Sequence, residues 1–304
     1  MHEKLIEAKF QEFWDFPSSD FKAEGMEVIG ATLGHYVVRF RHFVKYAEKD
    51  GTELHLNLHL PERGDEKLPL AIFIPGSAWR KQNIDDTTAQ MANFARRGFI
   101  VAQIEYRASS VAKFPAQIRD TRTAARFLLS HAEEFHIDKE RVFIWGDSSG
   151  AHTAVMTALT EGDPYFQDEE GEALPIKAIV DYYGPTDIAK MNFEPSIMDH
   201  ISWESPEGML IGGKNVLENP ELADETVVMN YITKEKQIAP LLIIHGDKDR
   251  LVPFGQSILL YNKMLEMGKE ARLIKMKWGD HGAEDFWSDR VFDIVEDFVR
   301  KMIG

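Results

Sequence analysis

The chain has 304 residues, no cysteine, and 35 Lys and Arg against 50 Asp and Glu, which gives a formal net charge of −15. The lack of cysteine excludes disulfides, thiol nucleophiles and cysteine-ligated zinc or iron–sulfur sites, and the acidic balance argues against a nucleic-acid partner, which needs a basic face. About 44% of the residues are apolar, enough for a sizeable core, but no stretch approaches the ~18 consecutive apolar residues of a membrane span.

The N-terminal region, residues 1–50, is interpreted as an extension that runs into the first strand. Its first 16 residues carry charges throughout and lack the apolar core of a signal peptide. We therefore expect a cytoplasmic protein with no membrane partner. The pattern over residues 5–16 predicts a short amphipathic helix.

Two strands are predicted next, over residues 36–44 and 53–60. The second alternates cleanly, with leucines on one face at positions 54, 56, 58 and 60. Its other face carries His55, Asn57 and His59, which we expect to be solvated. Two adjacent alternating strands indicate an antiparallel pair.

After residue 69, short apolar runs alternate with helical segments. The runs are residues 70–74, 99–104, 141–145, 176–182, 241–244 and 272–276. The helical segments between them are residues 85–97, 115–135, 151–159, 255–267 and 288–302. This alternation predicts a single α/β domain over residues 1–304, with a mostly parallel central sheet covered by helices on both faces. It lapses over residues 187–240, which we interpret as an insertion that forms a small cap.

The strand over residues 141–145 leads into a G-x-S-x-G pattern at residues 146–150, and a helix follows. In this strand–turn–helix context the pattern is typical of a nucleophile elbow, with Ser148 as the nucleophile. The glycines let the strand and the helix approach each other, and the sharp turn exposes the serine oxygen. One oxyanion donor is then the backbone N–H of Ser149, which directly follows the nucleophile.

A serine nucleophile needs a base, and His281 lies in the loop that follows the last predicted strand. The orienting acid is expected after the preceding strand, where Asp247 and Asp249 both stand. The second oxyanion donor is expected in the loop after the strand over residues 70–74, from the N–H of Ser77 or Ala78.

Large aromatic residues stand near these loops and are predicted to line a short substrate pocket. They are Trp79, Tyr182, Tyr183 and Trp203. Such side chains would favour short acyl chains and leave aromatic surface for the alcohol or an aromatic acid.

From residue 70 onward the chain resembles the esterase branch of the α/β-hydrolases, which includes hormone-sensitive-lipase-like carboxylesterases and bacterial feruloyl or acetyl-xylan esterases. The resemblance rests on F-P-x-x-x-x-D at residues 114–120, G-D-S-S-G at 146–150 and H-G-x-x-D-x-x-V-P at 245–253. The last motif implies that Asp249 is the acid of the triad. One departure is the oxyanion loop, where the family usually has H-G-G-G-W and this chain has P-G-S-A-W at residues 75–79, so the donating amide is left open.

The resemblance implies a serine carboxylesterase for short-acyl, small aromatic or carbohydrate-linked esters, with a small-molecule ester as its partner. The triad Ser148, Asp249 and His281 needs no cofactor and no metal ion. An amidase, peptidase or formamidase on the same triad stays open, because the fold does not determine the leaving group. A non-catalytic binding protein of this fold is a further alternative, and a homo-oligomer is also left open.

Overall fold

The computed structural model describes residues 5–31, 36–167 and 173–304. The chain divides into two units, Met1–Gly34 and His35–Gly304. The extension predicted over residues 1–50 lies partly outside the described residues, because it includes residues 1–4 and 32–35. Residues 5–31 contain no helix or strand, and the helix predicted over residues 5–16 is wrong. A lone segment of this length is marginal as a helix in water, and the described residues of its unit, 5–31, hold no second element for its apolar face.

Within the described residues, eight strands form one sheet in the order β1-β2-β4-β3-β5-β6-β7-β8. The strands are β1 (Val38–Lys49), β2 (Thr52–Pro61), β3 (Leu68–Ile74), β4 (Ile100–Ile104), β5 (Ile137–Asp147), β6 (Ile176–Tyr182), β7 (Leu241–Gly246) and β8 (Ala271–Met276). β2 pairs antiparallel with β1 and with β4, and every other pairing is parallel. The predicted fold class is confirmed.

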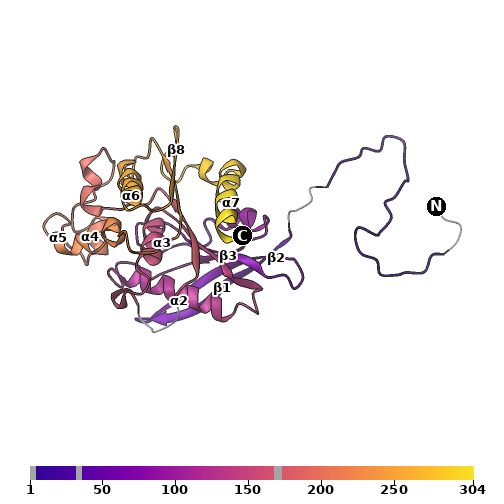
Figure 1. Cartoon of the computed structure of the whole chain (residues 1–304), viewed down its shortest axis with the longest axis horizontal. Helices are drawn as coiled ribbons and strands as arrows, with labels where there is room; N and C mark the ends of the chain where they lie inside the picture. Colours follow the sequence, from indigo (N-terminus) through magenta and orange to yellow (C-terminus); the bar gives the residue numbers. More distant parts are fainter. Residues whose placement is uncertain (1–4, 32–35, 168–172) are drawn as a thin grey trace. The chain divides into compact units, whose positions relative to one another are not determined.

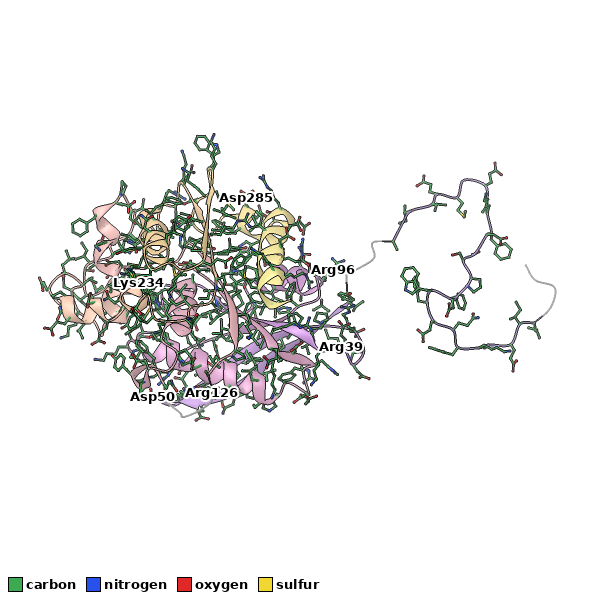
Figure 2. All side chains as sticks on the ribbon, in the orientation of Figure 1. Arg39, Asp50, Arg96, Arg126, Lys234 and Asp285 are labelled. Carbon is green, nitrogen blue, oxygen red and sulfur yellow. The ribbon has the colours of Figure 1, made fainter. Side chains whose placement is uncertain are left out.

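Helices cover both faces of this sheet (Figure 1). They are α1 (Thr88–Ala95), α2 (Ala116–Ser130), α3 (Ser149–Leu159), α6 (Gly255–Glu266) and α7 (Asp289–Ile303). Ile72 of β3 belongs to a core shared with α2, α3 and α6, whereas its neighbour Phe73 belongs to a second core with Phe94 of α1 and Phe292 of α7. Successive strand residues point to opposite faces, so apolar runs supply both cores, and side chains fill the space on each side of the sheet (Figure 2).

The face of β2 that we expected to be solvated is buried instead. His55 is 9% exposed, and Asn57 and His59 are 0% exposed. Phe43, beside an irregularity in the β1 register, stacks on His55 with ring centroids 4.0 Å apart. Asn57 receives a hydrogen bond from the Phe43 N–H and donates to Ile84 O. The alternation assigned the side chains of β2 to the correct two faces. It could not show that other parts of the chain, including Phe43 and Ile84, pack against the face that carries His55 and Asn57.

The segment over residues 187–240 contains only short helices. They are η2 (Ile188–Phe193), α4 (Pro206–Leu210), α5 (Pro220–Asp224) and η3 (Val228–Tyr231). In the part of the chain that the structure describes, no helix combines the length and apolarity that crossing a bilayer requires.

Candidate active site

Ser148 stands on a sharp turn between β5 and α3. Its backbone has φ 52° and ψ −129°, and its N–H donates to Tyr182 O at 2.8 Å. The turn depends on the two flanking glycines, because a Cβ on Gly146 would collide with the Gly150 backbone and one on Gly150 with the Ile74 carbonyl. The local sequence therefore folds as the predicted elbow and presents the Ser148 hydroxyl at the N-terminus of a helix.

His281 reaches this hydroxyl from the loop after β8. Its Nε2 lies 2.9 Å from Ser148 Oγ, and its Nδ1 lies 2.7 Å from Asp249 Oδ2. A carboxylate only accepts hydrogen bonds, so Nδ1 carries the ring proton. Nε2 of the neutral ring is then free to accept the hydroxyl proton, as a general base requires.

Asp249 is fixed from several directions in the loop after β7. Its Oδ1 accepts from the N–H groups of Leu251 and Val252 at 2.9 and 2.8 Å. Oδ2 lies 3.2 Å from His245 Nε2 in addition to its contact with His281. Burial alone would raise the pKa of Asp249, but hydrogen bonds and attraction from His245 and His281 bring it well below its ordinary value. Asp249 therefore remains an anion that accepts a hydrogen bond from His281 Nδ1.

The loop after β3 is fastened to the elbow. The Gly76 N–H donates to Asp147 Oδ1 and the Ser77 N–H donates to Ser149 Oγ, both at 2.9 Å. Ala78 and Trp79 have φ values of 54° and 53°, the left-handed region that glycine adopts without strain.

Of the two predicted loop donors, the Ser77 amide is thus already engaged, whereas the Ala78 N–H donates to no other described residue. Ser149 begins α3, where N–H groups have no acceptor within the helix. Of the three predicted donors, the amides of Ala78 and Ser149 are therefore the two without an acceptor among the described residues.

Asp147, next to the nucleophile, is a polar residue of the site that we did not single out in the sequence. Burial raises the pKa of Asp147 from 3.8 to about 6, against the lowering effect of the Gly76 hydrogen bond. The Tyr183 hydroxyl donates to its Oδ2 at 3.4 Å. The G-D-S-S-G motif at residues 146–150 includes Asp147, but the motif alone does not indicate that its carboxylate binds the Gly76 N–H of the oxyanion loop.

A cavity of about 280 Å³ opens at Ser148 and His281. Trp79 lines it, as predicted. The other three predicted aromatics are not among its lining residues. Tyr182 and Tyr183 lie in the core beneath the site, with Tyr183 packed against the His281 ring at 4.7 Å between centroids. Trp203 is 57% exposed.

The segment over residues 187–240 instead supplies lining residues that were not predicted from the sequence. Four of its residues line the cavity: Met198, His200, Pro206 and Glu207. Leu251 and Val252 of the Asp249 loop complete this side. No motif marks the insertion residues, so only the folded chain reveals them.

Comparison with known proteins supports an esterase relationship. The BD-FAE family model matches residues 56–264, a range that includes Ser148 and Asp249 and ends before His281. The esterase LipC of Mycobacterium tuberculosis is 26% identical over 192 residues, which cover 62% of this chain and 46% of LipC. The chain spans about half the length of the curated relatives it matches.

Solved structures show the same relationship over more of the chain. A truncated carbohydrate esterase from gut microbiota has a TM-score of 0.76 and 28% identity, covering 90% of this chain and 99% of that one. A bifunctional GH43-CE protein of Bacteroides eggerthii has a TM-score of 0.77 and 26% identity, covering 87% of this chain and 38% of that one. The expected α/β-hydrolase fold is therefore confirmed.

Proposed function

The chain belongs to the BD-FAE family, and on that premise we propose that it is a serine carboxylesterase that acts on short-acyl esters of carbohydrates or other small alcohols. The observation that carries the proposal is the hydrogen-bonded series Ser148–His281–Asp249, with both links under 3 Å. Resemblance to a carbohydrate esterase structure over 90% of the chain supports the substrate class.

In the first half of the reaction, Ser148 Oγ attacks the ester carbonyl while its proton passes to His281 Nε2. The resulting imidazolium is stabilised by Asp249, which already accepts from Nδ1. Negative charge on the former carbonyl oxygen is stabilised by the N–H groups of Ala78 and Ser149. His281 then protonates the departing alcohol, and an acyl-enzyme remains on Ser148.

In the second half, water takes the place of the alcohol. His281 accepts a proton from the water as its oxygen attacks the acyl carbonyl, and it returns that proton to Ser148 Oγ when the acid leaves. The N–H groups of Ala78 and Ser149 stabilise the oxyanion in this half as they do in the first.

Replacing Ser148 with alanine tests the proposal. We expect kcat for p-nitrophenyl acetate to fall on the order of 10⁶-fold, the usual cost of losing a triad nucleophile, while the melting temperature stays close to that of the parent. A Ser148→Ala protein that keeps a tenth of the activity would refute the assignment of the nucleophile.

A further inference from the structure

A buried carboxylate with an unpaired acceptor oxygen stands in the wall of the cavity. Glu207 is 2% exposed and lines the cavity together with Ser148 and His281. Its Oε1 lies 2.8 Å from His200 Nδ1. Its Oε2 is buried and has no hydrogen-bond partner among the described residues. The triad and the oxyanion loop make no use of this oxygen.

The local sequence holds Glu207 in this position firmly. Ser205 caps α4 by accepting the Gly208 N–H at 2.9 Å, and Pro206 occupies the first turn, where a missing N–H costs nothing. A Cβ on Gly208 would collide with the Ser202 carbonyl, so α4 lies directly against the preceding loop. The carboxylate is therefore presented from a rigid turn.

His200 leaves Oε2 as an acceptor whichever atom holds the proton between the two side chains. The imidazole Nε2 lies 2.9 Å from Leu251 O, an acceptor, and so carries a hydrogen. The remaining proton lies between Nδ1 and Oε1. If it is on Nδ1, Glu207 is a carboxylate; if it is on Oε1, Oε2 is a carbonyl oxygen. In both cases the pair is neutral overall and Oε2 can only accept.

An unpaired buried acceptor is costly, and native proteins keep few of them. A donor from a bound substrate would remove that cost. A neutral pair suits a neutral donor, because the pair would not compensate the charge of an ammonium group placed against it, next to the apolar Met198, Pro206 and Val252. The chemical group that fits these conditions is a hydroxyl.

Resting on the proposed esterase function, we propose that Glu207 is a specificity-determining residue whose Oε2 accepts a hydrogen bond from a hydroxyl group of the ester substrate. The hydroxyl can belong to the alcohol, as in a partly acetylated sugar, or to the acid, as in a hydroxycinnamate. Both sources share the same donor, and matched substrates distinguish them.

The test compares kcat/KM within two ester pairs that differ by hydroxyl groups. The first pair is 2-hydroxycyclohexyl acetate and cyclohexyl acetate; the second is methyl 4-hydroxycinnamate and methyl cinnamate. Glu207→Met removes both carboxylate oxygens and with them the acceptor for the hydroxyl, whereas a glutamine would donate its NH₂ to His200 Nδ1 and leave an acceptor oxygen in place. We expect the hydroxylated-to-plain ratio to fall about tenfold in one pair, as loss of a buried hydrogen bond predicts. The pair that responds identifies the side of the ester that carries the hydroxyl.

Ratios measured on one protein sample are independent of the fraction that is folded. If Glu207→Met has no activity on any ester, Glu207→Asp is used, whose shorter carboxylate can still bind His200 but withdraws its second oxygen from the position of Oε2, and the same tenfold fall is expected. Glu204→Gln, at an exposed position three residues earlier, is the matched control and should leave both ratios unchanged.

Ratios that stay within about twofold of the parent in both pairs would overturn the role of Glu207 while leaving the esterase assignment intact. A parent protein that hydrolyses none of the four esters would overturn the proposed function, and the inference with it.

Discussion

Asp247 and Asp249 stand two residues apart in one loop but have different partners. Asp249 Oδ2 lies 2.7 Å from His281 Nδ1, with its side chain fully buried. Asp247 accepts the Trp278 N–H at 2.6 Å and connects two loops. The sequence left both residues open as the acid until the family motif favoured Asp249, and the geometry favours the same residue.

We predict that Asp249→Asn lowers kcat by about 10⁴, because an asparagine amide stabilises the wrong tautomer of His281; this is the cost known for the equivalent change in a serine protease. Asp247→Asn is the control, since its amide oxygen can still accept the Trp278 N–H, and kcat should change by less than about threefold. Steady-state kinetics on p-nitrophenyl acetate measure both. Equal losses at the two positions would contradict the assignment of Asp249.

Asp147 should leave a signature in the pH dependence of stability. Its pKa is raised from 3.8 to about 6 in the folded protein, so the folded state binds this proton more tightly than the unfolded state. Its contribution to the unfolding free energy is therefore fully present below about pH 4 and is lost as the pH rises to about 6.

Asp147→Asn removes this titration but keeps an oxygen for the Gly76 N–H. We expect the stability of the variant relative to the parent to increase by about 1–3 kcal/mol between pH 4 and pH 7. Urea unfolding at a series of pH values measures the difference. A difference that does not vary with pH would show that Asp147 ionises normally in the folded protein.

The segment over residues 187–240, which we interpreted as an insertion, contributes four residues to the lining of the cavity. Its residues Met198 and Pro206 line the same cavity as Trp79, and the Ile197 N–H donates to Arg250 O at 2.9 Å, which ties this segment to the loop of Asp249. A volume of about 280 Å³ lies below the usual range of roughly 300–1,000 Å³ for ligand sites.

This limited volume predicts a preference for short acyl chains. Each added methylene contributes about 0.8 kcal/mol only while the cavity has room for it, and overpacking then costs more than burial returns. We expect kcat/KM for p-nitrophenyl esters to be highest between acetate and butyrate and to fall steeply by decanoate. A maximum at ten carbons or more would mean that the insertion opens to admit long chains.

Sequence patterns predicted the regular elements well, since each follows from periodicity. All six apolar runs after residue 69 are strands, and the five helical segments are helices with shifted ends. The elbow and the two loops of the proposed triad could be located in the sequence because each directly follows a predicted strand. In a parallel sheet the ends of these strands lie at the same edge. The wall residues His200 and Glu207 could not be predicted, because the irregular backbone of the insertion has no period that would indicate which side chains point inward.

At the scale of the whole molecule, the site unites residues from distant parts of the chain. Ser148 and His281 are 133 positions apart in sequence, yet their side chains meet at 2.9 Å. The parallel arrangement of β3, β5, β7 and β8 brings four loops to one edge of the sheet, which is where sites form in open α/β sheets. Neither the composition nor the local sequence shows that these four loops meet. They meet because of the order in which the strands lie in the sheet.

The central claim is that Ser148 is an activated nucleophile, and covalent labelling tests it most directly. Purified full-length protein is treated with a p-nitrophenyl alkylphosphonate, and intact-mass and peptide mass spectrometry locate the adduct. We predict one phosphonyl group per chain, on the peptide that contains Ser148, with loss of esterase activity in the same proportion and no adduct in Ser148→Ala. An adduct on another residue, or activity that survives full labelling of Ser148, would contradict the account.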